Sequence, residues 1–310
     1  MNKKFSLSDL IAPVSVDDFK RDFYQQFPLY LPRQEPGFFT GLLSKDEIIS
    51  YFQRNDFRYP NNISLYKDGN AVDSALYTYD IVAAGTTQKV VDTRKVFYQF
   101  SQGATILMGG VEFCIDSMRD FCSSIVSNLR CNTSITGLYT PANSRGFQPH
   151  FDNVDVFVFQ LYGTKKWKIY ADPHHYAVHN ADCDVKDSEL FLDVELNPGD
   201  TLYVPRGYVH DVHCTENESF HLTLGLAPTT WIDVVDYVLL DKKRLVGFRA
   251  PVDIDGLNEM AVRYRLSTLF NKILDDISVT EIKGFLNAKI DRHLEVFNND
   301  YLDHLESNLK

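Results

Sequence analysis

A series of short β-type segments between residues 134 and 228 constrains the fold of this chain more than any other feature. The segments are rich in Val, Phe, Tyr and Ile and are interrupted by Gly, Pro, Asn and Asp. Many short strands at such close spacing indicate a sandwich or a barrel. The clearest strands are predicted at 154–161, 165–170, 201–204 and 220–226.

Helical patterns flank this β region on both sides. On the N-terminal side the sequence predicts a helix over 15–26 capped by Ser15, a second one opened by the capping box of Ser44 and Glu47, and a third over 115–128. On the C-terminal side helices are predicted from 231, over 257–276 and over 279–296, with Thr280 as a candidate cap. Residues 58–91 contain turn signals and short apolar stretches that give no clear order of elements.

Charge and cysteine usage narrow the class of protein. The 310 residues include 31 Lys and Arg against 42 Asp and Glu, a net charge of −11 that disfavours nucleic-acid binding. The densest basic run, 242–244, is short enough to be a solvated helix face. The five cysteines form no CxxC pair, which predicts reduced thiols. The sequence shows neither a signal peptide nor an apolar run of about 18 residues, so we expect a cytoplasmic protein that does not cross a membrane.

A His-x-Asp pair, His150 and Asp152, is the first candidate for chemistry. In an extended segment residues i and i+2 face the same side, so this imidazole and this carboxylate can bind one metal ion. Such a pair alone is a weak signal. The similar pairs that begin at His293 and His304 lie in helical sequence, where i and i+2 diverge, and are interpreted as solvated surface.

A second motif lies 60 positions downstream. Residues 199–210 read Gly-Asp-Thr-Leu-Tyr-Val-Pro-Arg-Gly-Tyr-Val-His, which is a turn, a strand, a second turn and then His210. This spacing resembles the second cupin motif, and the region around His150 resembles the first one with its second His replaced by Asp152. Where many cupins carry a fourth, glutamate ligand, this chain has Val156 and Phe157. The resemblance implies a facial triad of two His and one carboxylate that leaves metal positions open.

The same residues, extended by Asp155 to Trp167, resemble the JmjC-type 2-oxoglutarate oxygenases, and in particular the ribosomal oxygenases that hydroxylate Arg or His. The resemblance covers about 103–228. It implies a double-stranded β-helix core of the cupin/JmjC type at 103–228, preceded by an α/β segment at 1–102 and followed by a helical domain at 229–310. It also implies Fe(II) on His150, Asp152 and His210, with 2-oxoglutarate and O₂ as cosubstrates, and hydroxylation of a protein side chain, perhaps in a basic ribosomal protein.

Further site residues are implied by the same resemblance. The family places a basic residue fifteen positions after the first ligand to bind the far carboxylate of 2-oxoglutarate, and Lys165 stands there. A straight hairpin would carry Lys165 roughly 20 Å from the metal end, so the assignment requires curvature or a bulge. Thr136 and Thr223, with His221, are further candidates to line the cosubstrate pocket, although a buried core role is equally compatible with each.

Several alternatives remain open from sequence. His213 competes with His210 as the third ligand, because residues i and i+3 of a strand face opposite ways and only one can serve. His174, His175 and His179 lie in a polar loop and suggest no site. Other cupins are metal-dependent isomerases, sugar-binding or small-molecule-binding modules, or proteins without catalysis that only bind partners. Relatives of the oxygenase type often dimerise through helices after the barrel, which makes a homodimer through 229–310 a hypothesis.

Overall fold

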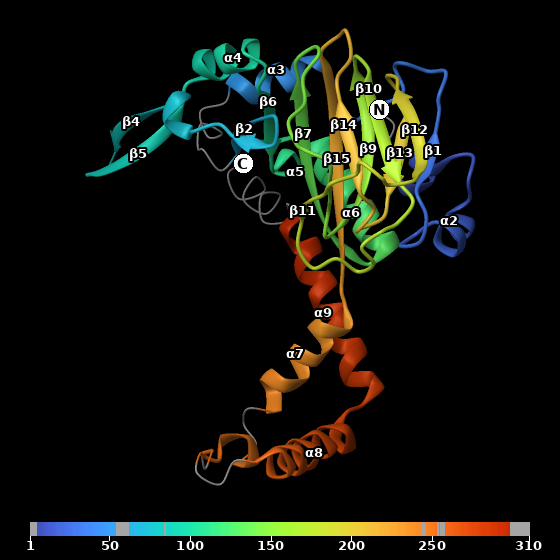
Figure 1. Ribbon diagram of the computed structural model, residues 1–310, viewed down its shortest axis with the longest axis vertical. Coiled ribbons are helices and arrows are strands. Elements are labelled where there is room, and N and C mark those ends of the chain that lie inside the picture. The colour runs from blue at the N-terminus through green and yellow to red at the C-terminus, as the bar shows by residue number, and fades with distance from the viewer. Residues whose placement is uncertain are drawn as a thin grey trace, which may run out of the picture. The chain divides into compact units, whose positions relative to one another are not determined.

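The computed structural model describes residues 5–53, 62–83, 85–242, 246–252, 254 and 258–297. The chain divides into two compact units, Met1–Ala227 and Pro228–Lys310 (Figure 1). The first unit holds the β region and the second is helical. No helix in the described part of the chain combines the length and the apolar character needed to span a bilayer.

Two antiparallel sheets form the core of the first unit, as the strand pattern predicted. The larger sheet has the order β1-β13-β9-β15-β7-β6-β2-β3 and the smaller one the order β11-β8-β14-β10-β12. The strands of the larger sheet are β1 (Leu29–Leu31), β2 (Ile63–Lys67), β3 (Asn70–Ala71), β6 (Thr105–Gly109), β7 (Cys131–Thr140), β9 (Asp155–Tyr162), β13 (Thr201–Val204) and β15 (Ser219–Pro228). Those of the smaller sheet are β8 (His150–Phe151), β10 (Lys165–Tyr170), β11 (Ala181–Asp182), β12 (Leu190–Leu196) and β14 (His210–His213).

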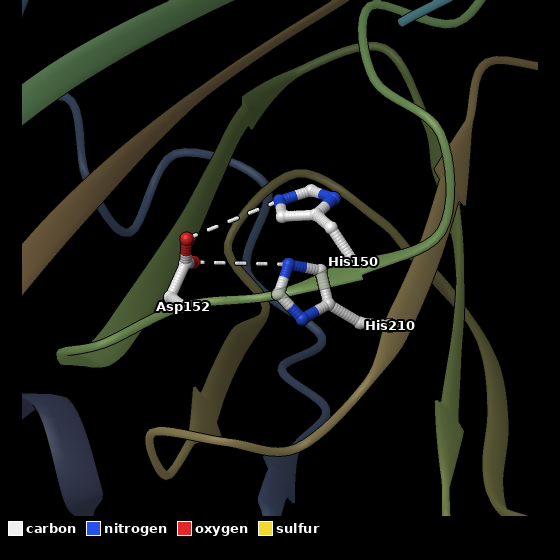
Figure 2. A group of neighbouring side chains, drawn as sticks. All are labelled: His150, Asp152 and His210. Carbon is white, nitrogen blue, oxygen red and sulfur yellow. Dashed lines mark ion pairs between the residues drawn. The ribbon is translucent and has the colours of Figure 1, made fainter. Parts of the chain in front are cut away.

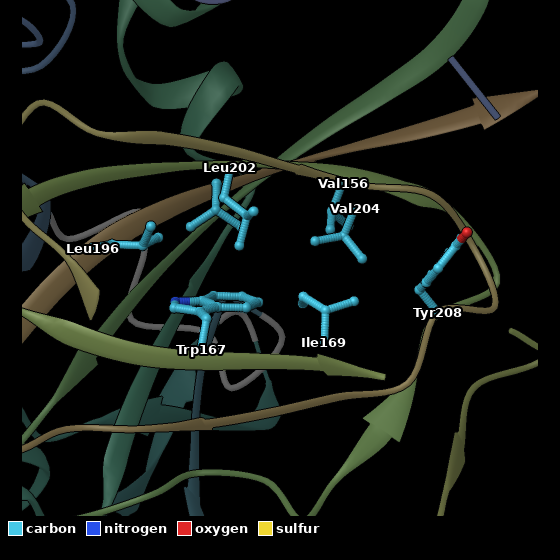
Figure 3. Close-up of a cluster of buried hydrophobic side chains, with 8 residues drawn as sticks. Val156, Trp167, Ile169, Leu196, Leu202, Val204 and Tyr208 are labelled. Atoms are coloured by element: carbon cyan, nitrogen blue, oxygen red, sulfur yellow. The ribbon is translucent and has the colours of Figure 1, made fainter. Parts of the chain in front are cut away.

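Apolar side chains from both sheets meet between them (Figure 3). Each fully buried aliphatic or aromatic side chain stabilises the fold by roughly 1.5–3 kcal/mol. Because this layer joins β9 and β13 of one sheet to β10 and β12 of the other, it sets the spacing of the two sheets. The cluster consists of Val156, Val158, Trp167, Ile169, Leu196, Leu202, Val204 and Tyr208.

Strand β9 is buried on both faces, which explains its continuous apolar sequence. Its inner face packs in the cluster of Figure 3. On its outer face the ring of Phe157 lies 5.5 Å from that of Phe19 in α2 (Val16–Asp22), and the ring of Phe159 lies 5.9 Å from that of Phe121 in α6 (Asp116–Leu129). Helices from the N-terminal part of the chain therefore cover the larger sheet.

The helices of the first unit are short apart from α6. They are α1 (Leu7–Ile11), α2 (Val16–Asp22), α3 (Lys45–Gln53), α4 (Thr93–Ser101), α5 (Val111–Cys114) and α6 (Asp116–Leu129). The capping box before α3 is present, since the Ser44 N–H donates to Glu47 and the Glu47 N–H donates to the Ser44 hydroxyl. Strands β4 (Thr78–Ala83) and β5 (Thr86–Val91) form a separate hairpin that extends away from the two sheets (Figure 1).

One helix boundary differs from the prediction. The sequence predicts a helix that continues to Gln26, whereas α2 ends at Asp22. Gln25 takes a left-handed conformation with φ of 60°, and its N–H donates to the Tyr203 hydroxyl at 2.8 Å. A tertiary hydrogen bond 178 positions away in sequence therefore turns the chain before the local pattern would end the helix.

The second unit contains α7 (Trp231–Lys242), α8 (Glu259–Asp276) and α9 (Val279–Phe297). Val234, Val238 and Ile273 form its buried centre, and the ring of Tyr237 stacks on that of Phe285 at 4.2 Å. The predicted cap at Thr280 is wrong, because α9 already begins at Val279 and the Ser278 hydroxyl accepts the Glu281 N–H. Residues 243–244 of the basic run, residue 257 at the predicted helix start and the pair that begins at His304 lie outside the described residues.

Candidate metal centre and cosubstrate pocket

Two strands of the smaller sheet bring the residues of the two motifs together. His150 begins β8, His210 begins β14, and the two are direct register partners across the sheet. Asp152 follows β8, and its carboxylate reaches both rings, with Oδ1 4.0 Å from His150 Nε2 and Oδ2 3.8 Å from His210 Nε2 (Figure 2). One donor atom from each residue lies within 4.8 Å of the others.

Backbone carbonyls fix the orientation of both imidazoles. His150 Nδ1 lies 2.8 Å from the carbonyl oxygen of Gln148, and His210 Nδ1 lies 3.0 Å from that of Tyr208. A carbonyl only accepts, so each Nδ1 carries the proton and each Nε2 presents its lone pair toward Asp152. This is the tautomer that a metal ligand requires.

Burial favours the neutral form of His210. Its loss of hydration, together with the nearby His150, lowers the pKa of His210 to about 4. The ring is therefore neutral at pH 7 without a metal ion. Two imidazoles and a carboxylate fit a divalent ion such as Fe, Mn, Co, Ni or Zn. Among the described residues no fourth His, Cys, Asp or Glu joins the group.

The turn at 205–207 links the two motifs directly. Gly207 has φ of +86°, and its N–H donates to the Asp152 carbonyl at 2.9 Å. A Cβ at this position would lie 2.0 Å from the His174 carbonyl oxygen, so only glycine fits. Next to it, the buried Asp155 accepts the Arg206 N–H at 2.9 Å and the Tyr203 hydroxyl at 2.9 Å.

Two other histidines named from sequence, His213 and His174, lie away from the triad. His213 lines a second cavity of about 430 Å³ with Asp68 and Arg145, so His210 alone of the two competing residues meets His150 and Asp152. His174 stacks on Phe151 with ring centroids 4.3 Å apart and supports the loop before β11.

A cavity of about 520 Å³ connects the triad with Lys165. Thr136 and Leu138 on β7, and His221 and Thr223 on β15, line it as well. The structure therefore brings every residue predicted for the metal or the cosubstrate to the wall of one cavity.

Lys165 lies in this cavity without a carboxylate partner in the described chain. Its Nζ donates to the Thr140 hydroxyl at 2.8 Å and lies 3.4 Å from His221 Nδ1. Burial without a compensating anion lowers the pKa of this lysine to about 8. A cation in this state is a binding partner for an anionic group that enters the cavity.

The register explains how Lys165 reaches the metal end. Ile169 on β10 lies opposite His210, and Lys165 is four residues away on the same face, about 13 Å along the strand. The distance from Lys165 to the metal end is shorter than a straight hairpin suggests because β10 also pairs with β14. The length of the lysine side chain spans part of the remaining distance. Thr140 was missed from sequence, although it follows Thr136 by four residues on the same face of β7.

Comparisons with known proteins agree with this geometry. Residues 112–234 match the JmjC domain family. The chain is 27% identical over 240 residues to a bifunctional lysine-specific demethylase and histidyl-hydroxylase NO66 of Aedes aegypti, and 26% identical over 239 residues to ribosomal oxygenase 1 of Gallus gallus. These alignments cover 73% and 74% of this chain but only 35% and 38% of the relatives.

A solved structure shares the fold. YcfD, a ribosomal oxygenase from Escherichia coli solved with cobalt and 2-oxoglutarate, aligns with a TM-score of 0.56 at 17% identity, over 90% of this chain and 71% of YcfD. At this identity the likeness supports the arrangement of helices and strands. Two facing antiparallel sheets, a converging His-Asp-His group and the match over 112–234 together indicate a JmjC-type domain with a cupin-like fold in this part of the chain.

Proposed function

We propose that this protein is an Fe(II)- and 2-oxoglutarate-dependent dioxygenase that hydroxylates a protein side chain. The observation that carries the proposal is the pairing, in one cavity, of a three-donor metal group with a buried lysine that has no anion of its own in the described chain. The metal group leaves coordination positions open, and the lysine provides the charge that a dicarboxylate requires.

Different residues along the cavity would bind the metal and the cosubstrate. His150, Asp152 and His210 would hold the iron, and Lys165, whose Nζ donates to the Thr140 hydroxyl, would bind the far carboxylate of 2-oxoglutarate. When bound, iron and 2-oxoglutarate supply the chemistry that reduces O₂, with one oxygen atom leaving in succinate beside CO₂ and the other entering a C–H bond of the substrate. The apolar packing around Trp167 keeps the inner wall dry.

The substrate is proposed from the relatives. Their names describe a histidyl-hydroxylase and ribosomal oxygenases, which supports an Arg or His side chain of a ribosomal protein. Ribosomal proteins are basic, and the net charge of −11 favours their approach to this chain.

A direct test combines binding and turnover. We expect the purified protein to bind Mn(II) and 2-oxoglutarate by calorimetry, and to release succinate with Fe(II), ascorbate and 2-oxoglutarate. Asp152→Ala should abolish both, whereas Asp187→Ala, which removes an exposed carboxylate outside the cavity, should change neither. Metal binding without 2-oxoglutarate binding would support a non-oxygenase cupin instead. Mass spectrometry of the host proteome with and without the gene, searching for a gain of one oxygen atom, would identify the target.

We also propose that the second unit forms a homodimer, since α8 buries only Leu269 and Ile273 within that unit. Its exposed apolar residues are Met260, Val262, Tyr264, Leu266, Phe270 and Leu274. Light scattering at micromolar concentration should give twice the mass of one chain, and a monomer would rule the dimer out. The cytoplasmic location stays a prediction that fractionation of the host cell can test.

A further inference from the structure

A further cavity, of about 390 Å³, lies on the outer face of the larger sheet, where helices α3 and α4 lie side by side (Figure 1). We call it the outer cavity. Its volume is near the lower end of the roughly 300–1,000 Å³ that small-molecule sites occupy, which matches one compact ligand. Its lining is mostly apolar and includes five aromatic rings, those of Phe52, Phe97, Tyr139, Tyr162 and Phe220.

The larger sheet separates the outer cavity from the cavity at the triad, which we call the metal cavity. On β7, Tyr139 lines the outer cavity and its neighbour Leu138 lines the metal cavity. On β15, Phe220 lines the outer cavity and the next residue, His221, lines the metal cavity. Successive residues of a strand point to opposite faces, so the two cavities lie on opposite sides of these strands. A ligand of the outer cavity therefore binds without contact to iron or 2-oxoglutarate.

The rings of the outer cavity are held at steep angles to their neighbours. The Phe52 ring lies 5.3 Å from that of Phe97 at an interplanar angle of 58°, and the Tyr139 ring lies 6.2 Å from that of Phe220 at 73°. Ile49 and Phe97, which also line the cavity, keep 45% and 38% of their surface exposed, so a ligand buries apolar area there. An aromatic ligand gains about 0.5–1.5 kcal/mol from each ring pair beyond this area. The lining therefore favours an aromatic ligand over an aliphatic one.

One cation and one carboxylate line the outer cavity beside the rings. Lys45 is the first residue of α3 and is exposed, and its ammonium forms no ion pair within the described chain. Glu218 is exposed as well. Its Oε1 accepts the Tyr139 hydroxyl at 2.6 Å, and its Oε2 has no donor in the part of the chain that the structure describes. A ligand of a single charge is attracted by one of these side chains and repelled by the other, whereas a zwitterion is attracted by both.

We infer that the outer cavity is a binding site for a free α-amino acid with an aromatic side chain. The side chain lies among the five rings, the carboxylate pairs with the Lys45 ammonium, and the α-ammonium donates to Oε2 of Glu218. A residue inside a peptide carries neither of these charges and a terminal residue carries only one, so a free amino acid is the source that uses both. The site is additional to the proposed oxygenase function, and neither depends on the other.

The test compares indole compounds that differ in their charged groups. L-Tryptophan carries both groups, tryptamine only the ammonium, indole-3-propionate only the carboxylate, and indole neither. Calorimetry with the full chain should give a Kd below about 1 mM for tryptophan and binding about tenfold weaker for each analogue of single charge. Addition of Mn(II) and 2-oxoglutarate should leave the Kd for tryptophan unchanged, because the two cavities lie on opposite sides of the strands.

Two variants and a matched control complete the experiment. Glu218→Gln should weaken tryptophan and tryptamine about tenfold and leave indole-3-propionate unchanged, whereas Lys45→Gln should weaken tryptophan and indole-3-propionate and leave tryptamine unchanged. Glu216→Gln, which removes an exposed carboxylate that lines the cavity of His213 instead, should behave as wild type. Wild-type protein that binds tryptophan no more tightly than one of its analogues, or not at all, would overturn the inference. Displacement of tryptophan by 2-oxoglutarate would also overturn it, because the ligand would then lie in the metal cavity.

Discussion

Replacing Lys165 by Met should make the empty protein more stable and the loaded protein less stable. The lysine is 3% exposed, and the described chain offers it a hydroxyl and an imidazole but no carboxylate. Its pKa falls from the ordinary 10.5 to about 8, a difference that corresponds to about 3 kcal/mol of unfavourable charge burial. The variant also loses the hydrogen bond from Lys165 to Thr140, which costs about 1 kcal/mol and offsets part of this gain.

The net expectation is a gain of about 2 kcal/mol in the free energy of unfolding at pH 7 without metal and 2-oxoglutarate. For a unit of this size that gain raises the melting temperature by roughly 4–8 °C. Urea unfolding followed by the fluorescence of the buried Trp167 measures it. The control is Lys166→Met, because the neighbouring lysine side chain is 38% exposed and only pairs with Asp193 at 3.4 Å, so its loss should cost less than about 1 kcal/mol.

The difference in stability between Lys165→Met and the wild type should change with pH in one direction. Below pH 8 the lysine is charged in both the folded and the unfolded chain, so the full penalty is present. Between pH 8 and 10.5 the folded chain releases the proton first, and the penalty disappears. The stability advantage of Lys165→Met should therefore shrink as the pH rises through this range.

Ligand binding should make the wild type more stable than Lys165→Met, the reverse of the order expected without ligands. With Mn(II) and a 100-fold excess of 2-oxoglutarate over its Kd, the wild type gains about 2.7 kcal/mol. The variant should bind at least about 100-fold more weakly and gain about 0.4 kcal/mol or less, so the loaded wild type becomes the more stable of the two. A variant that is less stable than wild type when empty, or that binds 2-oxoglutarate within threefold of wild type, would refute the reasoning.

Three further outcomes are expected. Gly207→Ala should destabilise the first unit by about 3 kcal/mol or more in urea unfolding and also weaken Mn(II) binding, because the new Cβ meets the His174 carbonyl and displaces the N–H that holds Asp152. Gly85→Ala, at a positive φ with open space around it, should cost only about 1 kcal/mol. His210→Gln should abolish the rise in melting temperature that Mn(II) gives the wild type, and a chelator should reverse that rise in the wild type without unfolding it.

The triad of His150, Asp152 and His210 could be predicted from the sequence because the motifs that contain it are local. A His-x-Asp pair on an extended segment and a Pro-x-Gly turn before His210 each specify a side-chain direction over a few residues. Bounds of 165–170 and 201–204 were predicted for two strands, and these match β10 and β13. The two facing sheets follow from the same alternation of short apolar runs and turns, so the fold class was confirmed.

Features that depend on distant partners were not predictable in the same way. No sequence signal near Gln25 indicates that a hydrogen bond from its N–H to the Tyr203 hydroxyl accompanies the end of α2. Asp182 lies on β11, a strand of only two residues, and also lines the cavity. Its position there depends on pairing with His150, which stands 32 positions earlier in the chain. Lys165 was placed by family resemblance, because its reach depends on the pairing of β10 with β14. The division at residues 102 and 228 stays a prediction.

The arrangement of backbone bonds implies that the metal binds to a site that is already formed. The N–H of Gly207 holds the Asp152 carbonyl, the Gly207 carbonyl accepts the His174 N–H at 2.8 Å, and β8 pairs with β14 at the two histidines. Carbonyls on both Nδ1 atoms orient the rings before an ion arrives. A site formed in this way differs from a small zinc domain, in which the ion replaces a core and its removal unfolds the chain. Here the core of Figure 3 is built from side chains other than the three ligands, so folding does not require the ion. Ligand affinity and folding stability can therefore change in opposite directions, as expected for Lys165→Met, which should weaken 2-oxoglutarate binding and stabilise the protein without ligands.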